Sequence, residues 1–367
     1  MTNTAQSTRS SELRDSLAAL RQELHVLANA IGRTIRIMEV CGTHTVSIFR
    51  SGLRAHLPTT VRMISGPGCP VCVTAQSHID AVIRLAARPE VIIATYGDML
   101  RVPGRTGSLE IQRARGADVR IVQSARTALR LARDHPSSEV VFLGVGFETT
   151  APATAATIHE AAAAGITNFS VLMSHKRVVP AMRALLENGE VRIDGFLCPG
   201  HVSVIIGARA YQSIVDEFRR PCVIAGFEPE AMLRGITRIV RQIAAQDARL
   251  ENMYAAVVSE IGNTAAQRAL DEVFEACATP WRELGVIESS GYALREKYRQ
   301  FDATERFRIA FGPELPRAGC ICGRVITGAA EPSECKLFAR GCTPLTPIGP
   351  CMVSGEGTCA AWYRFGR

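Results

Sequence analysis

The sequence contains no long apolar run, and no stretch approaches the roughly 18 apolar residues that a membrane-spanning helix needs. Its first ten residues carry no apolar core of the kind that marks a secretory signal peptide. We therefore expect a cytoplasmic protein that does not bind membranes. Aromatic residues make up only 6% of the chain, and the lysines and arginines behind its net charge of +7 are spread along its length. With few aromatics and no basic run, nucleic-acid binding has little support.

Nucleotide-binding loops are also missing. The run Gly144-Val145-Gly146 starts like a G-x-G-x-x-G fingerprint, but Thr149 occupies the place of the third glycine. No G-x-x-x-x-G-K-[ST] loop occurs either. We therefore expect no nucleotide cofactor.

Cysteine, in contrast, is plentiful: the chain contains twelve, and six of them lie between residues 320 and 359. Glycines and prolines recur between these six, and their tight bends suit a loop wrapped around an inorganic centre. In a reducing cytoplasm, such cysteines are expected to be metal ligands or redox thiols rather than disulfides. The spacing predicts an iron–sulfur cluster with four thiolate ligands: Cys320, Cys335, Cys342 and Cys359.

The fourth ligand position is contested. Cys320 and Cys322 stand two residues apart and share a face of an extended backbone, so spacing alone does not choose between them. We assign Cys320 as the ligand and expect Cys322 and Cys351 to be spare thiols that relay electrons. Structural zinc is a less favoured alternative, because this tail lacks the closely spaced Cys-x(2–4)-Cys knuckles of zinc sites. Disulfides or plain buried thiols are the third alternative.

Cys41 stands at the junction of a predicted strand and a predicted helix. A run rich in β-forming residues, 34–40, precedes it, and helical spacing covers 45–53. The thiol would therefore lie near the positive end of a helix, with His44 beside it, and both neighbours favour the thiolate at neutral pH. A small buried thiol next to a capping threonine is the alternative.

The same arrangement recurs after the apolar strand predicted at 61–65. The loop Gly66-Pro67-Gly68-Cys69-Pro70-Val71-Cys72 follows it, and helical spacing resumes over 74–87. A C-x-x-C motif at a strand-to-helix junction predicts two thiols that can close a reversible disulfide. Half of a zinc knuckle would look the same, so a ligand or structural role is the alternative.

The chain then alternates between strands and helices up to about residue 247, which predicts parallel sheets in an α/β fold. Strands are expected at 90–95, 119–122, 139–145, 168–173, 194–197 and 221–225. Polar loops follow these strands, and ligands of α/β sheets bind at the carboxyl ends of strands. The candidate binding residues in these loops are Glu148, Thr149, Thr150 and His201.

From about residue 246 to residue 319 this alternation stops. Helices or helical fragments are expected at 251–261, 265–276 and 293–300. We expect this region to form the scaffold of a third domain that carries the cysteine tail. An amphipathic N-terminal helix, with leucines at spacings of three and four, is expected to pack on it.

Five motifs in a fixed order resemble the signature stretches of the HypD family of hydrogenase maturation proteins. The resemblance runs from about residue 30 to the C-terminus. The motifs are Cys41-Gly42-Thr43-His44-Thr45, Gly66-Pro67-Gly68-Cys69-Pro70-Val71-Cys72, Gly146-Phe147-Glu148-Thr149-Thr150-Ala151-Pro152, Pro199-Gly200-His201-Val202-Ser203 and Cys351-Met352-Val353-Ser354.

This resemblance implies two parallel-sheet α/β domains with a cleft between them, plus a mainly helical or irregular domain that holds a [4Fe-4S] cluster. We place the first α/β domain, with the loops of Cys41 and of the C-x-x-C motif, at 30–135 and the second at 136–247. The cluster domain takes 1–29 and 248–367.

The resemblance also implies a function. Proteins of this family serve as the scaffold on which the Fe(CN)2(CO) unit of [NiFe]-hydrogenase is assembled, together with the small chaperone HypC and with HypE supplying cyanide. Cys41 would then bind the iron, His44 would tune or deprotonate its thiol, and Cys69 and Cys72 would form a dithiol couple. The couple beside the cluster is similar to that of ferredoxin-dependent thioredoxin reductases. A monomer is expected before the partners bind.

Two other classes of function stay open at this point. A stand-alone iron–sulfur and dithiol oxidoreductase acting on protein disulfides would explain Cys69, Cys72 and the cysteine tail. It would not explain the Cys41 motif or the polar loops. The other class is a zinc-stabilised interaction protein, which would have no redox or assembly role.

Overall fold

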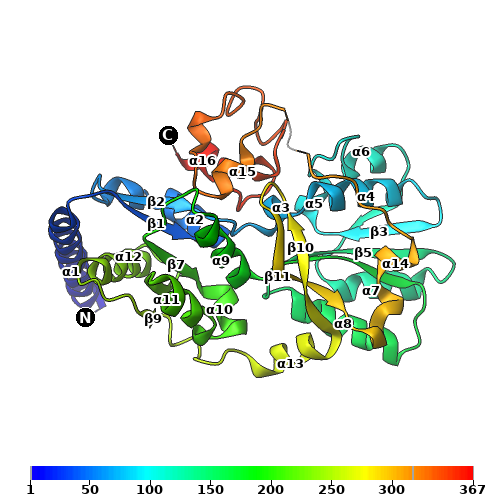
Figure 1. Cartoon of the computed structure of the whole chain (residues 1–367), viewed down its shortest axis with the longest axis horizontal. Coiled ribbons are helices and arrows are strands. Elements are labelled where there is room, and N and C mark those ends of the chain that lie inside the picture. Colours follow the sequence, from blue (N-terminus) through cyan, green and yellow to red (C-terminus); the bar gives the residue numbers. More distant parts are fainter. Residues whose placement is uncertain (1, 316–317, 367) are drawn as a thin grey trace.

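The computed structural model describes residues 2–315 and 318–366. Its centre consists of two parallel sheets with helices on their faces (Figure 1), which confirms the predicted α/β class. The first sheet has five strands in the order β2-β1-β7-β8-β9. Their bounds are β1 Ile35–Glu39, β2 Val61–Ser65, β7 Gly195–Pro199, β8 Cys222–Ala225 and β9 Leu250–Asn252.

The second sheet has four strands in the order β4-β3-β5-β6, and all of its pairs are parallel. The strands are β3 Val91–Thr95, β4 Val119–Ile121, β5 Glu139–Gly146 and β6 Phe169–His175. The central strand β3 is buried along its whole length, as strands covered by helices on both faces are.

The two sheets do not correspond to consecutive halves of the chain. After β2 the chain leaves the first sheet, builds all of the second, and returns with β7. The predicted division at residue 135 therefore does not match the sheets, because β3 and β4 precede it and yet share a sheet with β5 and β6. Alternating strands and helices predict parallel pairing, but they do not tell which strands are neighbours.

Helices cover the faces of both sheets. Those that follow the first sheet's strands are α2 Gly42–Arg50, α3 Pro70–Val73, α4 Gln76–Ala86, α10 Gly200–Ile206, α11 Gln212–Phe218 and α12 Pro229–Ala244. Those of the second sheet are α5 Gly97–Leu100, α6 Leu109–Ala114, α7 Ala125–Asp134, α8 Ala151–Ala163 and α9 Val178–Asn188. The C-terminal third adds α13 Thr264–Val273, α14 Ala303–Arg306, α15 Cys322–Ile326 and α16 Thr358–Phe365.

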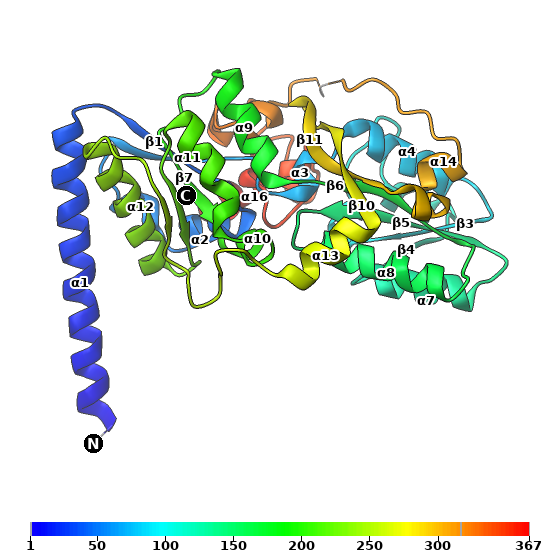
Figure 2. The same ribbon diagram turned by 60° about the horizontal axis from the view of Figure 1, so that its bottom comes forward.

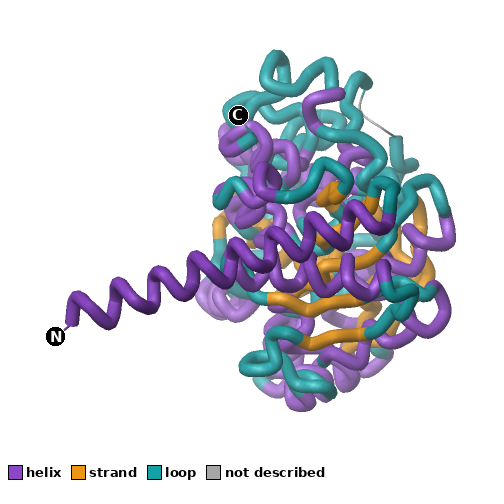
Figure 3. The backbone as a smooth tube through the Cα atoms, turned by 90° about the vertical axis from the view of Figure 1, so that its left-hand side faces the viewer, coloured by secondary structure: helices purple, strands orange, loops and turns teal. Residues whose placement is uncertain are grey.

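The first helix, α1 (Thr2–Ile31), lies against α12 and the first sheet, and its N-terminal part projects away from the molecule (Figures 2 and 3). Leu24 and Ala28 are fully buried in a cluster that also contains residues of β1 and α12. The expected docking of this helix on the cysteine-bearing domain is therefore wrong. Its apolar stripe predicts that it packs, but not on which partner.

A β-hairpin occupies part of the region where helices were expected. Its strands, β10 (Phe274–Trp281) and β11 (Gly285–Leu294), are antiparallel and replace the end of the predicted helix 265–276 and the first two residues of 293–300. Most of the predicted fragment 293–300 is helical, as the 3-10 helix η3 (Glu296–Phe301). The predicted helix 251–261 is absent, since turns follow β9 there. Pairing along the hairpin and full burial of Trp281 outweigh the helix propensity of the alanines in β10.

None of the helices in the described part of the chain is both long and apolar enough to cross a membrane.

The packing of α1 leads to a stability prediction. Leu24→Ala should lower the free energy of unfolding by about 2–5 kcal/mol, because it removes buried methyl groups and leaves a cavity. Val26 lies on the same helix but is 57% exposed, so Val26→Ala is the matched control and should change little. Thermal unfolding followed by circular dichroism measures both. Equal melting temperatures for the two variants would show that α1 is not part of the cooperative fold.

Candidate functional site

A cleft of about 510 Å³ opens where the carboxyl ends of strands from both sheets face each other. The loops after β1, β2, β3, β5 and β7 line it, together with one residue of the C-terminal tail. The predicted gathering of polar loops at strand ends is thus observed. The residues with polar side chains in its wall are Cys41, Thr43, Tyr96, Asp98, Thr149, Thr150, His201 and Glu356.

Cys41 lies at the first turn of α2, where it is the N-cap residue and is 8% exposed. The sulfur makes no capping hydrogen bond, but the backbone N–H groups of His44 and Thr43 lie near it and favour its anionic form. Burial nevertheless raises the pKa of the thiol to about 11. The expectation of a thiolate at neutral pH is therefore wrong, since desolvation outweighs the helix terminus.

The His44 side chain does not serve as the partner of that thiol. Its Nε2 lies 3.2 Å from the carbonyl oxygen of Gly226, to which it donates, and its ring packs on Phe227. Burial lowers the pKa of His44 to about 4, so the ring is neutral at pH 7. The predicted deprotonation of Cys41 by this imidazole is not supported by these contacts. What reaches the sulfur is the backbone of His44.

Beneath Cys41 lies a buried carboxyl group, Glu39. It accepts a hydrogen bond from the Thr45 hydroxyl at 2.6 Å and a longer one from the Cys41 N–H at 3.4 Å. Burial raises the pKa of Glu39 to about 8. The Glu39 carboxyl group near the thiol is therefore mostly protonated, and so uncharged, at pH 7.

Gly68 brings the loop of the C-x-x-C motif against the loop of Cys41. The N–H of Gly42 donates to the Gly68 carbonyl at 3.3 Å. A Cβ atom on Gly68 would lie 2.3 Å from the backbone nitrogen of Cys41. A side chain at position 68 would therefore force the two loops apart.

The predicted binding residues do not all face the cleft. Thr149, Thr150 and His201 line it, and the His201 ring packs on Phe227 with centroids 4.2 Å apart. Glu148 does not line it: its carboxylate turns away and accepts the N–H of Val178 at 2.9 Å. Burial raises the pKa of Glu148 to about 7. The path of the backbone between β5 and α8 decides which of these neighbouring side chains faces the cleft. The sequence alone does not tell in which direction each side chain points.

Glu356 is a cleft residue that the sequence did not reveal. It comes from the tail, and its Oε1 accepts a hydrogen bond from the Thr43 hydroxyl at 2.8 Å. Gly42 lies under it, since a Cβ atom there would be 2.6 Å from the Glu356 Cβ. No local pattern pointed to it, because it is more than 300 residues from the loop that it contacts.

Cys69 and Cys72 lie side by side at α3. Cys69 is the N-cap residue, and its sulfur accepts the N–H of Cys72 at 3.3 Å. Both thiols are free and buried. This is the geometry predicted for a pair that can close a disulfide.

The tail folds so that all six of its cysteines line one cavity, whose other walls are mainly apolar. The cavity is lined by Cys320, Ile321, Cys322, Val325, Cys335, Leu337, Phe338, Cys342, Gly349, Cys351, Met352 and Cys359. Among the described residues, no three His, Cys, Asp or Glu side chains are close enough to hold a single metal ion. A cubane cluster is wider than one ion, and a set of thiols in an apolar shell is its usual donor environment. The N–H of Ile348 also donates to the Cys342 sulfur at 3.3 Å, a bond typical of cluster ligands. The donor set therefore fits a [4Fe-4S] cluster.

A chain of thiols connects this cavity with the dithiol at α3. Cys322 and Cys351 approach each other to 2.7 Å between their sulfur atoms. Cys351 is also within hydrogen-bonding range of Cys72 on one side and of Cys359 on the other. The two thiols left out of the predicted ligand set thus also line the cysteine cavity, and Cys351 links it to Cys72.

The tail is docked firmly on the helix that starts at Cys41. Trp362 of α16 packs on Phe49 of α2 with ring centroids 5.2 Å apart. Arg54 stacks on both rings and forms an ion pair with Glu331 of the tail at 2.8 Å. The cleft and the cysteine cavity therefore belong to one packed unit.

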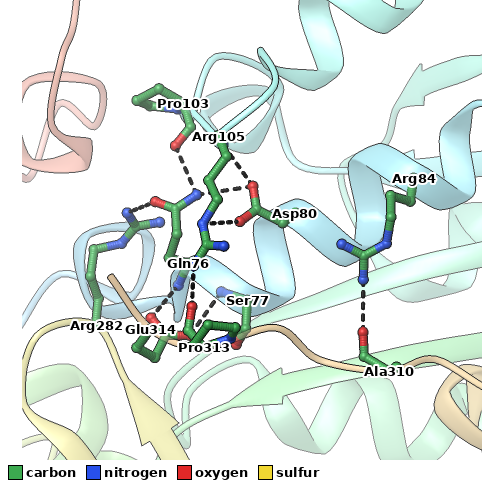
Figure 4. Close-up of polar contacts among 10 residues, drawn as sticks. All are labelled: Gln76, Ser77, Asp80, Arg84, Pro103, Arg105, Arg282, Ala310, Pro313 and Glu314. Atoms are coloured by element: carbon green, nitrogen blue, oxygen red, sulfur yellow. Dashed lines mark hydrogen bonds and ion pairs between the residues drawn. The ribbon is translucent and has the colours of Figure 1, made fainter. Parts of the chain in front are cut away.

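The segment that leads into the tail, residues 307–315, is tied along α4 (Figure 4). The Glu314 carboxylate accepts the N–H groups of Gln76 and Ser77, each at 2.8 Å, where the N-cap residue Ala75 has no acceptor of its own. Arg84 donates to the carbonyl of Ala310 at 2.8 Å. Hydrogen bonds from this segment therefore fix the short turn between α3 and α4 and the start of α4.

Comparison with known proteins gives a consistent family. The model of the HypD family, described as hydrogenase formation hypA family, matches residues 15–366. The hydrogenase maturation factor HypD of Escherichia coli (strain K12) is 48% identical over 94% of this chain and 93% of its own length. The factor of the same name from Rhodobacter capsulatus is 46% identical over 97% of both chains. A putative hydrogenase expression/formation protein of Methanocaldococcus jannaschii is 42% identical over 94% of this chain and 96% of its own.

The close approach of the two cysteine loops can be tested at Gly68. Gly68→Ala should destabilise the protein by about 1–3 kcal/mol, because the methyl group meets backbone atoms that have no room to move. It should also speed the alkylation of Cys41, as the loops separate. Gly97→Ala in the same cleft is the control, since its methyl group meets only Ile121, at 3.9 Å. Unchanged Cys41 reactivity in the Gly68 variant would contradict the proposed contact.

Proposed function

The chain belongs to the HypD family, and on that basis we propose that it is the scaffold and redox protein on which the Fe(CN)2(CO) unit of [NiFe]-hydrogenase is assembled. The general role in hydrogenase maturation follows from the family. The single observation that best supports the finer assignment is the place of Cys41, a thiol at the start of a helix in the wall of a cleft shared by both sheets.

The cleft offers what an iron cargo with diatomic ligands requires. Cys41 supplies one soft donor, and the nearby backbone N–H groups of His44 and Thr43 favour the anionic form once iron displaces the thiol proton. The Thr149 hydroxyl can donate a hydrogen bond to a cyanide nitrogen, whereas the hydroxyl protons of Thr43 and Thr150 are already donated to Glu356 and to the Phe147 carbonyl. Apolar side chains such as Val145 and Phe147 form much of the remaining wall and limit water around the cargo.

We propose HypC and HypE as the partners. One cysteine in the cleft leaves other coordination positions of the iron free, and a small chaperone that carries its own donor would complete them. The cleft is open on one side, which leaves room for such a partner and for the delivery of cyanide. A cytoplasmic location and a monomeric state before complex formation stay predictions.

The proposed ligands of a resident [4Fe-4S] cluster are Cys320, Cys335, Cys342 and Cys359. When bound, the cluster would supply one-electron transfer, with electrons from an external one-electron reductant. Cys322 approaches both Cys351 and Cys320, so these contacts do not choose between Cys320 and Cys322, and Cys320 is kept as the proposed fourth ligand.

The spare thiols then act by disulfide exchange. The Cys351 thiolate attacks the Cys72 sulfur of a Cys69–Cys72 disulfide, that bond breaks, and Cys69 leaves and takes up a proton. Cys322 next attacks Cys351, and Cys72 leaves as a thiol. A Cys322–Cys351 disulfide has formed, and two electrons have moved to the Cys69–Cys72 pair. The thiol contacts described above support this order.

A stand-alone oxidoreductase acting on protein disulfides is the alternative. Burial argues against it, since Cys69 and Cys72 are 6% and 1% exposed and leave little access for the disulfide of another protein. A purely structural zinc site would leave the Cys41 cleft without explanation.

The function is tested at Cys41. Cys41→Ala should abolish hydrogenase maturation in a host that lacks its own HypD, and purified protein should lose the infrared bands of iron-bound cyanide and carbon monoxide. Its brown cluster colour should stay, because the two sites use different cysteines. Cys277→Ala, at a half-buried cysteine outside both sites, is the control and should keep both signals. Full cyanide and carbonyl bands in the Cys41 variant would refute the cargo site.

Single serine substitutions test the cluster ligands. Each variant of a proposed ligand should lose most of its iron and visible absorption after anaerobic purification. The residues to be substituted are Cys320, Cys335, Cys342 and Cys359. Cys322→Ser should keep both, because that thiol is assigned to the relay. A bleached Cys322 variant beside a coloured Cys320 variant would reverse the choice between them. A coloured Cys342 variant would overturn the four-ligand scheme.

A further inference from the structure

A second cavity, of about 230 Å³, lies at the opposite end of the first sheet from the Cys41 cleft. It is lined by residues that precede four adjacent parallel strands, β1, β7, β8 and β9, and by the last turn of α12. We call it the amino-edge pocket. The charged residues that line it are Arg33, Arg192, Asp194, Arg219, Arg220 and Asp247.

The amino-edge pocket carries more positive than negative charge. Four arginines and two aspartates line it, which leaves a surplus of two positive charges. Arg249, which does not line the pocket, forms an ion pair with Asp247, so that carboxylate already has a partner. The last turn of α12 adds only about half a negative charge from the helix dipole. The aspartates and the helix end therefore do not balance the four guanidinium groups.

Asp194 holds two of these arginines in place. Its side chain is 5% exposed, and its Oδ1 forms ion pairs with Arg33 and Arg192, each at 3.0 Å. Its Oδ2 accepts the backbone N–H of Arg36 at 2.8 Å. Both oxygens of this carboxylate are therefore occupied. Because Asp194 already orients the two guanidinium groups, they lose little further side-chain entropy when an anion binds.

The other two arginines have no such partner. In the described part of the chain, neither the Arg219 nor the Arg220 side chain makes a hydrogen bond or an ion pair. The Nε of Arg220 is buried without an acceptor, which costs free energy that an anion in the pocket would recover. Arg219 follows α11 in the left-handed region, at φ 52°, where glycine is the usual residue. Neither the backbone nor a local contact therefore favours an arginine at position 219.

The size and the chemistry of the pocket indicate the class of its ligand. Guanidinium groups bind phosphate and other oxyanions through pairs of N–H donors. The pocket is smaller than the roughly 300–1,000 Å³ of sites for drug-sized ligands. A small oxyanion therefore fits it better than a nucleotide does, and the positive surplus disfavours a metal ion.

We propose that the amino-edge pocket binds a small oxyanion of the phosphate type, with Arg219 and Arg220 as its main ligands and Arg33 and Arg192 beside them. The ligand is free phosphate or the phosphate group of a small ester. The bound anion joins the segments that enter β1, β7 and β8, and it stabilises the first sheet because it binds only the folded protein. The pocket is separate from the Cys41 cleft, so this inference does not rest on the proposed function.

The test uses the full-length protein, purified anaerobically, and isothermal titration calorimetry at constant ionic strength. Inorganic phosphate and glycerol 3-phosphate are the two probes, and the unchanged protein should bind one anion per chain. Tighter binding of the ester would identify the phosphate group of a small metabolite as the ligand, and tighter binding of phosphate would identify the free anion. Phosphate should also slow the hydrogen exchange of peptides that cover residues 190–194 and 219–222.

Substitutions show whether the pocket holds the anion. Arg220→Gln should weaken phosphate binding by about tenfold or more, because it removes a charge-assisted hydrogen bond. Arg126→Gln is the matched control, since it removes the same charge from a side chain that is 75% exposed on α7 and does not line the pocket. It should bind phosphate as the unchanged protein does. If Arg220→Gln does not fold, Arg219→Gln tests the same pocket at an exposed residue.

Four results would overturn the site. They are no saturable phosphate binding by the unchanged protein, unchanged affinity in the pocket variant, an equal loss in the Arg126 variant, and protection from exchange confined to other segments. An equal loss in the control would show general attraction by the net charge and no defined site. None of these measurements reads the cargo or the cluster, so their failure would leave the proposed function standing.

Discussion

The site depends on one steric constraint, the contact of two loops whose backbones meet without a side chain between them. Gly68 lies so close to Cys41 that a methyl group would overlap its nitrogen. This contact places the loop of Cys41 beside the loop of Cys69 and Cys72. The tail then closes over the same region through Glu356 and Trp362. The cleft, the Cys69–Cys72 pair and the cysteine cavity are therefore neighbours because the adjacent parallel strands β1 and β2 end side by side.

Burial, rather than local sequence, sets the electrostatics of this region. The start of a helix next to a histidine favours a thiolate, and the sequence led to that expectation for Cys41. Desolvation raises the pKa of Cys41 and lowers that of His44, so both are neutral at pH 7. Under the proposed function, such a neutral site would ionise the sulfur only when a metal ion binds.

Local patterns predicted the elements well and their partners poorly. Strand-to-helix alternation gave the parallel sheets, and the cysteine spacings gave the dithiol and the cysteine cavity. The order of strands in the sheets, the partner of α1 and the hairpin β10–β11 depend on contacts between distant residues, which a periodicity does not contain. The same is true of Glu356, which reaches the cleft from the far end of the chain, and of Glu148, which turns away from it.

The interleaved sheets also have a consequence for synthesis on the ribosome. The first sheet starts with β1 and β2, yet its central strand β7 and its last strands arrive only after the whole second sheet has been made. The second sheet is contiguous and can fold while the chain is still growing, whereas Cys41 and the dithiol wait for β7. Glu356 arrives last of all. A nascent chain therefore does not present the complete cleft until residue 356 has been made.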